Sequence, residues 1–219
     1  MLLSLLIACA PVMRFPGPLS GMGFDPEIQD SAQNTPTQGP PPSARAIVSA
    51  AKNFVGDSKL SVAGTAYRYD CSGLVEAALA SAHCPFKGSS AMLWEEAVRL
   101  GIAHHRRVPT PGDVAFFDDT YDRDGNGRLG DALTHVAVVE SVDGAGTVTL
   151  VHVGSAGVVR FQMNLRHPGD RDDAHGTRRN DYLRQQSAGD SGATRYLSGE
   201  LWHGFASFYK VQAQIADRS

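Results

Sequence analysis

The chain has 219 residues, 42% of them hydrophobic, which is enough for one ordinary domain with a full core. Its formal net charge of -3 excludes the broad basic surface by which proteins bind nucleic acid or anionic membranes. We therefore expect a monomer with one folded domain and no nucleic-acid partner.

The first thirteen residues, MLLSLLIACAPVM, are almost wholly apolar. They are too few to cross a bilayer as a helix but are typical of the core of a secretory signal. Leu6-Ile7-Ala8-Cys9 resembles the bacterial lipobox, in which cleavage leaves a lipidated cysteine as the first residue. We expect a lipoprotein signal over residues 1–9 and a membrane anchor through lipid on Cys9. This places the protein in the cell envelope, facing the periplasm, or outside the cell if it is not lipidated.

An apolar tail with a chance cysteine is the alternative for this segment. No Lys or Arg precedes the apolar run, although a signal normally begins with positive charge. A start codon placed too late would explain the missing charge.

Residues 10–42 are rich in Pro, Gly, Gln, Ser and Thr without periodicity, so they cannot bury enough apolar surface to fold alone. We expect a flexible tether there, a folded domain over residues 43–212 and a tail over residues 213–219. Within the domain, residues 164–199 are polar and charged. A loop of that length is usually functional or disordered, and we place it at the rim of the site.

Helical periodicity fills the first half of the folded domain. The expected helices run from a cap at Ser43 to Gly56, from Cys71 (capped by Asp70) to about Ala82, and over about residues 91–100. After Pro109 the pattern changes to period two and β-branched runs. The expected strands are residues 114–117, 135–142, 148–153, 158–163 and 205–211. This order indicates the α+β class, with N-terminal helices packed on an antiparallel β-meander.

The three cysteines, Cys9, Cys71 and Cys84, are too few and odd in number for a disulfide framework. Cys71 falls on the first turn of a helix, where unpaired backbone N–H groups and the helix dipole favour a thiolate. The same N–H groups could hold the oxyanion that forms when the thiolate attacks an amide. The alternative is a buried cysteine that packs as a small apolar side chain.

A thiol nucleophile needs a base, and two histidines flank an expected hairpin. A two-residue turn at Asp143-Gly144 would place His135 directly opposite His152, on one face of the sheet. A four-residue loop would make the pair diagonal on the same face, and only an odd-length loop would separate them. The other histidines are interpreted as packed or solvated residues: His83, His104, His105, His167, His175 and His203.

These residues resemble the NlpC/P60 peptidases, cell-wall enzymes with a papain-like core. The motifs follow the family's order: Asp-Cys-Ser-Gly-Leu-Val at 70–75, Pro-Gly-Asp-Val at 111–114, Thr-His-Val-Ala-Val at 134–138 and Val-His-Val-Gly at 151–154. The resemblance implies that Cys71 is the nucleophile, His135 the base and His152 the residue that orients the base.

The resemblance also implies substrate contacts at Tyr67, Asp70 and Ser72. The family usually has a tyrosine and a Gly-Gly pair before the Asp-Cys, whereas here only Ala66-Tyr67-Arg68-Tyr69 precedes it. Tyr67 is alternatively an aromatic core anchor, and Asp70 is alternatively only a helix cap.

The implied activity is hydrolysis of an amide bond in the peptidoglycan stem peptide, typically between D-glutamyl and a diamino acid. An amidase or an acyltransferase on the same core stays open, because an acyl-enzyme can pass its acyl group to water or to another nucleophile. A wall-binding lipoprotein that has lost activity is the third possibility. None of these reactions requires a cofactor.

An acidic loop precedes His135, and Asp122, Asp124 and Asn126 place an oxygen ligand at every second position of it, as calcium loops require. A structural calcium ion would stiffen the segment that leads into His135. The alternative is a solvated Asp/Gly/Asn turn without metal. The twelfth position is Leu133 rather than a bidentate Glu. The shell would have to be completed by one of three further carboxylates: Asp118, Asp119 or Asp131.

Overall fold

The structure is a computed structural model that describes residues 39–211. The expected signal, Cys9, the tether up to residue 38 and the tail lie outside the described residues. Within residues 39–211, no helix is both long and apolar enough to cross a membrane.

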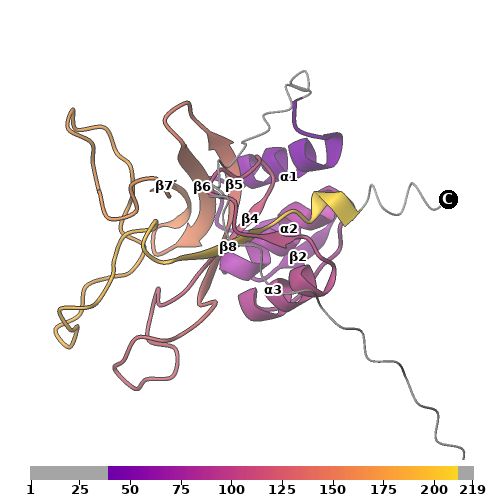
Figure 1. Cartoon of the computed structure of the whole chain (residues 1–219). Coiled ribbons are helices and arrows are strands. Elements are labelled where there is room, and N and C mark those ends of the chain that lie inside the picture. The colour runs from indigo at the N-terminus through magenta and orange to yellow at the C-terminus, as the bar shows by residue number, and fades with distance from the viewer. Residues whose placement is uncertain (1–38, 212–219) are drawn as a thin grey trace, which may run out of the picture. The chain divides into compact units, whose positions relative to one another are not determined.

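The described residues form three helices and two antiparallel sheets, in the α+β class expected from the sequence (Figure 1). The helices are α1 (Pro42–Asn53), α2 (Cys71–Ser81) and α3 (Ser90–Arg99). The strands are β1 (Leu60–Val62), β2 (Thr65–Tyr67), β3 (Ala103–His104), β4 (Val114–Phe117), β5 (His135–Val142), β6 (Thr147–Gly154), β7 (Gly157–Asn164) and β8 (Trp202–Ala206).

The helix starts follow their capping chemistry. Helix α2 begins at Cys71, as predicted, and the Asp70 side chain accepts a hydrogen bond from the backbone of its first turn. The expected Ser43 cap is wrong, because α1 already begins at Pro42, which needs no N–H at this position. The Ser43 hydroxyl instead donates to the Tyr209 carbonyl oxygen at 3.3 Å.

The larger sheet has six strands in the order β3-β8-β4-β5-β6-β7. Strands β4 to β7 form the expected meander, but β8 returns to lie between β3 and β4. It also spans Trp202–Ala206 rather than residues 205–211, and residues 209–211 are helical. The small β1–β2 hairpin was not predicted, since each of its strands has only three residues.

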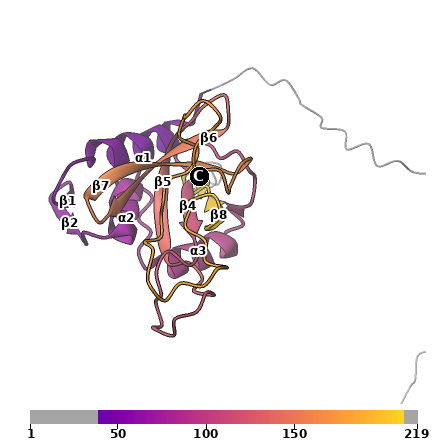
Figure 2. The ribbon, with the colours of Figure 1, turned by 90° about the vertical axis from the view of Figure 1, so that its left-hand side faces the viewer.

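The six-stranded sheet carries a separate apolar core on each face, as alternation along β4 shows. Val114 and Phe116 pack with the three helices, on what we call the helix side. Ala115 and Phe117 pack with residues of β5, β6 and β7 on the opposite face, the loop side. The two views in Figures 1 and 2 show the helices gathered on one face of this sheet.

The polar segment after β7 covers the loop side and is held by hydrogen bonds. The fully buried Asn180 side chain accepts from the backbone N–H groups of Asn164 (2.8 Å) and Gly199 (3.1 Å). It also donates to the carbonyl oxygens of His167 (2.8 Å) and Asp170 (2.7 Å). One side chain thus joins three points of the segment to each other and to the end of β7.

Candidate active site

The motif around Cys71 fixes the first turn of α2. The Asp70 carboxylate accepts from the Gly73 backbone N–H at 2.7 Å, and the Leu74 N–H donates to the Asp70 carbonyl oxygen at 3.0 Å. A Cβ atom at residue 73 would lie only 1.9 Å from the Arg68 carbonyl oxygen. Glycine is therefore required there, because the chain entering the helix passes directly over its first turn.

The thiol of Cys71 is partly buried at this helix terminus. Burial raises the pKa of Cys71, whereas hydrogen bonds from the Val136 backbone and the Ser72 side chain lower it; the charge of Asp70 raises it again. The net shift is upward, opposite to the thiolate expected from the helix terminus alone. Burial wins because a charged sulfur loses its hydration. The thiol thus needs a base to become a nucleophile.

His135 and His152 lie together, as predicted. The His135 Nε2 and His152 Nδ1 atoms are 2.8 Å apart, within hydrogen-bond distance, and the two rings are nearly perpendicular. This bond leaves Nδ1 of His135 as the nitrogen that could accept a proton from a thiol. It matches the expected arrangement of a base and an orienting residue.

The predicted turn between the two histidines is wrong. The Asp143 N–H donates to the Thr147 carbonyl oxygen, so residues 144–146 form a three-residue loop, with Gly146 at a φ of 81°. An odd-length loop alone would place the two histidines on opposite faces of the sheet. Some other irregularity must bring them back together.

That irregularity is a β-bulge at Glu140. Val139 pairs with Leu150 but Ser141 pairs with Thr149, so Glu140 is an extra residue of β5. Beyond the bulge Val138 pairs with Val151, and one further step places His152 opposite Ala137, two residues from His135. The pair is therefore diagonal, on the loop side of the sheet, and not directly opposed as the two-residue turn predicted.

Both imidazoles are held neutral. Burial lowers the pKa of His135 to about 3, and the neighbouring His152 adds to this shift. Burial also lowers the pKa of His152 to about 4, against the opposing charge of Asp181. Near pH 7 one ring then donates and the other accepts, and a proton on His135 Nε2 leaves its Nδ1 lone pair free.

The Cys71 thiol lies beside the start of β5. Cys71 takes a hydrogen bond from the backbone of Val136, the residue that follows His135. The described residues show no hydrogen bond between the Cys71 thiol and the His135 ring. Such contacts often form only when substrate is bound.

A cavity of about 1150 Å³ opens beside the two histidines. Residues after β6, in the acidic loop and in the segment after β7 line it, whereas Cys71, Tyr67, Asp70 and Ser72 do not. The expected position of residues 164–199 at the rim of the site agrees with this lining. Composition and spacing do not indicate which side chains of that segment face the cavity.

Residues 62–153 match the CHAP domain family model. The matched segment includes Cys71, His135 and His152. The match supports a cell-wall hydrolase of the amidase or peptidase kind and agrees with the NlpC/P60-like cell-wall domain indicated by the motifs.

Two further comparisons are less informative. No curated protein matches the chain. Among solved structures, the chain is similar to a Staphylococcus aureus protein described as similar to lipoprotein, NLP/P60 family, with 19% identity and a TM-score of 0.37. The similarity covers 70% of this chain and 45% of that one, so the chain spans less than half of its length.

The substrate-binding residues expected within the CHAP match lie away from the cavity. Tyr67 packs against the helix-side core, which agrees with the alternative of an aromatic anchor. Asp70 acts as a helix cap and lies 3.7 Å from Arg68 Nε. Ser72 is buried, and its side chain contacts the Cys71 thiol. Their contacts with substrate stay predictions.

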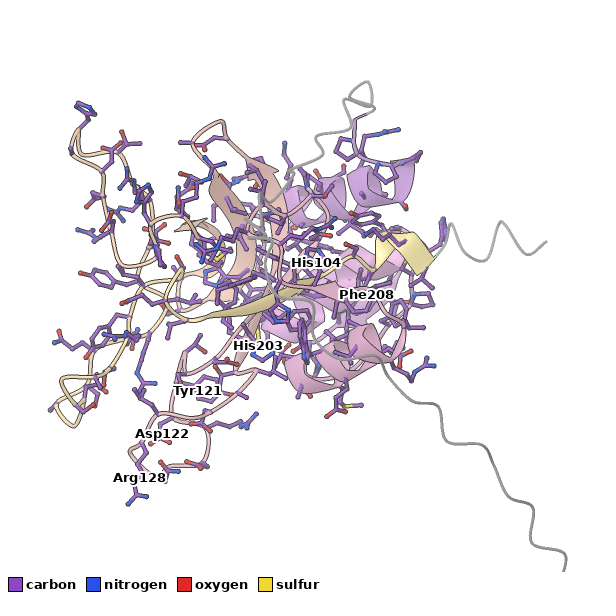
Figure 3. The ribbon with its side chains drawn as sticks, viewed as in Figure 1. His104, Tyr121, Asp122, Arg128, His203 and Phe208 are labelled. Carbon is purple, nitrogen blue, oxygen red and sulfur yellow. The ribbon has the colours of Figure 1, made fainter. Side chains whose placement is uncertain are left out.

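The acidic loop projects away from the helices, and Tyr121, Asp122 and Arg128 mark its course in Figure 3. Single carboxylate oxygens of Asp122, Asp124 and Asp131 all lie within 4.8 Å of one another. The Asn126 side-chain oxygen instead accepts from the Arg128 N–H at 2.7 Å. The expected calcium ligands are thus brought together only in part, with Asp131 as the added carboxylate.

Proposed function

We propose that this protein hydrolyses an amide bond of the peptidoglycan stem peptide, with Cys71 as nucleophile, His135 as base and His152 as the residue that orients the base. The observation that supports this proposal is the 2.8 Å contact between His135 Nε2 and His152 Nδ1, which leaves His135 Nδ1 for the thiol. A neutral thiol and a neutral imidazole are the resting partners.

In the first half of the reaction, His135 Nδ1 takes the thiol proton while the Cys71 sulfur attacks the amide carbon. The C–N bond then breaks, and the imidazolium returns that proton to the leaving amine. The product is a thioester on Cys71. In the second half, His135 takes a proton from water, and the resulting hydroxide attacks the thioester carbon. The C–S bond breaks to release the carboxyl product, and the imidazolium returns its proton to the sulfur.

The oxyanion of each step would be held at the first turn of α2. Asp70 occupies the N–H of Gly73 and the N–H of Leu74. The N–H groups of Cys71 and Ser72 are the remaining donors of this turn. Donors placed where negative charge develops contribute most to catalysis of acyl transfer.

The anchor and the metal remain proposals of the same kind. Lipid on Cys9 would hold the enzyme at a membrane facing the wall, and Cys9→Ser should release it into the soluble fraction. Calcium bound near Asp122 and Asp124 would stiffen the loop before His135 and take no part in the chemistry.

Digestion of purified peptidoglycan, with products identified by mass spectrometry, tests the function and names the scissile bond. The wild type should release peptides, and Cys71→Ala should release none. Cys84→Ala should match the wild type, because the Cys84 thiol is buried in the core and cannot reach the substrate. A new amine and carboxyl group at one bond indicates hydrolysis. A product that gains another amine instead would indicate the acyltransferase alternative, and equal activity of Cys71→Ala would rule the proposal out.

A further inference from the structure

The lining of the cavity beside the histidines contains few charged side chains. Its charged side chains are Asp122, Arg184 and Asp190, and each is already engaged. Arg184 pairs with Asp190 at 3.5 Å, and both side chains are about nine-tenths buried. Arg184 also donates to the Asp119 carbonyl oxygen at 2.6 Å, while its enclosed Nε atom has no partner. These contacts fix the wall of the cavity, and the paired charges of Arg184 and Asp190 largely cancel, which leaves little charge to attract a ligand.

Asp122 is likewise turned toward its own loop. Its Oδ1 accepts from the N–H groups of Gly125 and Asn126, and its Oδ2 accepts from Gly127 at 2.8 Å. Asp190 is further satisfied by Tyr196, whose hydroxyl donates to it at 3.0 Å. A ligand that depends on ion pairs, such as an isolated stem-peptide carboxylate, therefore finds no carboxylate without a partner here and only one guanidinium, which is already paired with Asp190.

Exposed aromatic rings and neutral polar groups make up much of the remaining lining. Tyr121 is 52% exposed and Tyr182 is 63% exposed, and they come from two loops on different sides of β5 in the sequence. Arg171 lies 5.2 Å from the centre of the Tyr182 ring and thus covers one of its faces. Gln185, Gln186 and other amide or hydroxyl side chains supply hydrogen-bond donors and acceptors without charge.

Such a combination suits a sugar ring. The C–H groups on the flat side of a pyranose carry a small positive charge, which the negative face of an aromatic ring attracts. Its hydroxyl and acetamido groups are neutral and need several hydrogen-bond partners. Two exposed aromatic rings and neutral amides in the lining of one cavity offer both kinds of contact.

We propose that this cavity binds the saccharide of peptidoglycan, with amino-sugar rings stacked on Tyr121 and Tyr182 and hydrogen-bonded to Gln185 and Gln186. The identity of the saccharide rests on the proposed function, whereas the cavity's preference for a neutral sugar rests on its lining. Because His135 and His152 line the same cavity, the enzyme then acts on peptide still attached to the glycan strand. A peptide with its sugar is the better substrate.

Binding is tested with a tetramer of β-1,4-linked N-acetylglucosamine and full-length Cys71→Ala, followed by NMR titration. Tyr121→Ala and Tyr182→Ala should each weaken binding about threefold to tenfold, while Tyr182→Phe keeps the ring and the affinity. Met92→Ala, at an exposed position on α3, serves as the matched control. Absence of binding, or equal binding by the double alanine variant, would overturn the proposal.

Hydrolysis separates this proposal from the proposed function. With the wild type, a disaccharide-peptide should have a lower KM than the same peptide without sugar, and Tyr121→Ala with Tyr182→Ala should remove that advantage. Equal KM values for both substrates would overturn the saccharide site and leave the hydrolase. If neither substrate is cleaved, the proposed function fails, and the binding titration still decides on the saccharide.

Discussion

The two faces of the six-stranded sheet are held together in different ways. The helix side is a continuous apolar core, in which α1 and α2 pack across β5 around Ile47, Leu74 and Val138. On the loop side, polar groups fix the long segment after β7, as the four hydrogen bonds of Asn180 show. Apolar packing dominates the helix side, whereas on the loop side directed polar contacts add to a second apolar core.

This difference separates two tasks of the site. The thiol comes from the helix side and lies beside the backbone of Val136, whereas the histidines and the cavity lie on the loop side. In the proposed function, the reacting groups would meet at the first residues of β5. Variants of Cys71 and the two histidines should change turnover, variants of helix-side packing should change global stability, and the remaining loop-side variants should raise the KM for the substrate. The following variants test that separation.

The largest effect is expected from the histidines themselves. His135→Ala should lower turnover about a thousandfold or more, since a thiol with a raised pKa then has no base. His152→Ala should lower it about tenfold to a hundredfold, because this residue acts through His135. Initial rates on purified peptidoglycan measure both. Full activity of His135→Ala would show that another group is the base.

On the helix side, Gly73→Ala should cost about 3 kcal/mol of unfolding free energy, because the new Cβ would lie 1.9 Å from the Arg68 carbonyl oxygen. Helix propensity alone predicts that this substitution stabilises the protein, because alanine favours a helix more than glycine does, so the expected destabilisation has the opposite sign. Urea unfolding measures it. Gly144→Ala, with no atom within 4 Å of the new Cβ, should stay within about 0.5 kcal/mol of the wild type.

On the loop side, Asn180→Ala should cost about 2 kcal/mol, because it leaves buried backbone groups without partners. Its KM for peptidoglycan should rise, while the rate at which iodoacetamide alkylates Cys71 stays unchanged. Asn180→Asp keeps the acceptor oxygen but places a second buried oxygen against the carbonyl oxygens of His167 and Asp170, so it should cost at least as much stability as Asn180→Ala. A changed alkylation rate would show that the two sides are not separable.

The histidine pair should also make stability depend on pH. Both folded pKa values, about 3 and about 4, lie below the ordinary value of 6.5, so the unfolded chain binds protons more readily. This contribution to stability is complete above pH 6.5 and is lost as the pH falls through 4 to about 3. Thermal melts should show this fall, and His135→Gln should reduce its slope. An unchanged slope in that variant would contradict the assignment.

The smallest effect is expected from calcium. If the loop binds it, the melting midpoint should rise by about 2–4 °C on adding calcium to chelated protein. Asp122→Ala combined with Asp124→Ala should abolish the rise. A wild-type midpoint that does not respond to calcium would remove the metal from this account.

Local rules predicted the helix side well. The Asp70 cap and the start of α2 at Cys71 follow from capping chemistry within a few residues, and β4 follows from its apolar run. The Ser43 cap failed because Pro42 competes with it for the start of α1. Strand β8 was displaced because its pairing with β4 joins residues far apart in the chain.

The loop side could be predicted only in outline. The two histidines were expected on one face, and they are, but the loop length was wrong and the bulge at Glu140 was not foreseen. The cavity lining depends on contacts such as that between Arg184 and the Asp119 carbonyl oxygen, 65 residues apart. No periodicity or spacing encodes such a contact, so the exposed tyrosines could not be assigned to the site.

The bulge at Glu140 has a consequence for how this hairpin can change in length. The three-residue loop alone would place His152 on the opposite face of the sheet from His135. The extra residue of β5 shifts the register by one more residue, so the two effects cancel and both histidines lie on one face. A relative that loses one residue from the loop keeps the histidine contact only if a second single-residue change occurs between His135 and His152. Insertions and deletions here must therefore come in compensating pairs, and an alignment with one unpaired gap would match His152 to a residue on the wrong face.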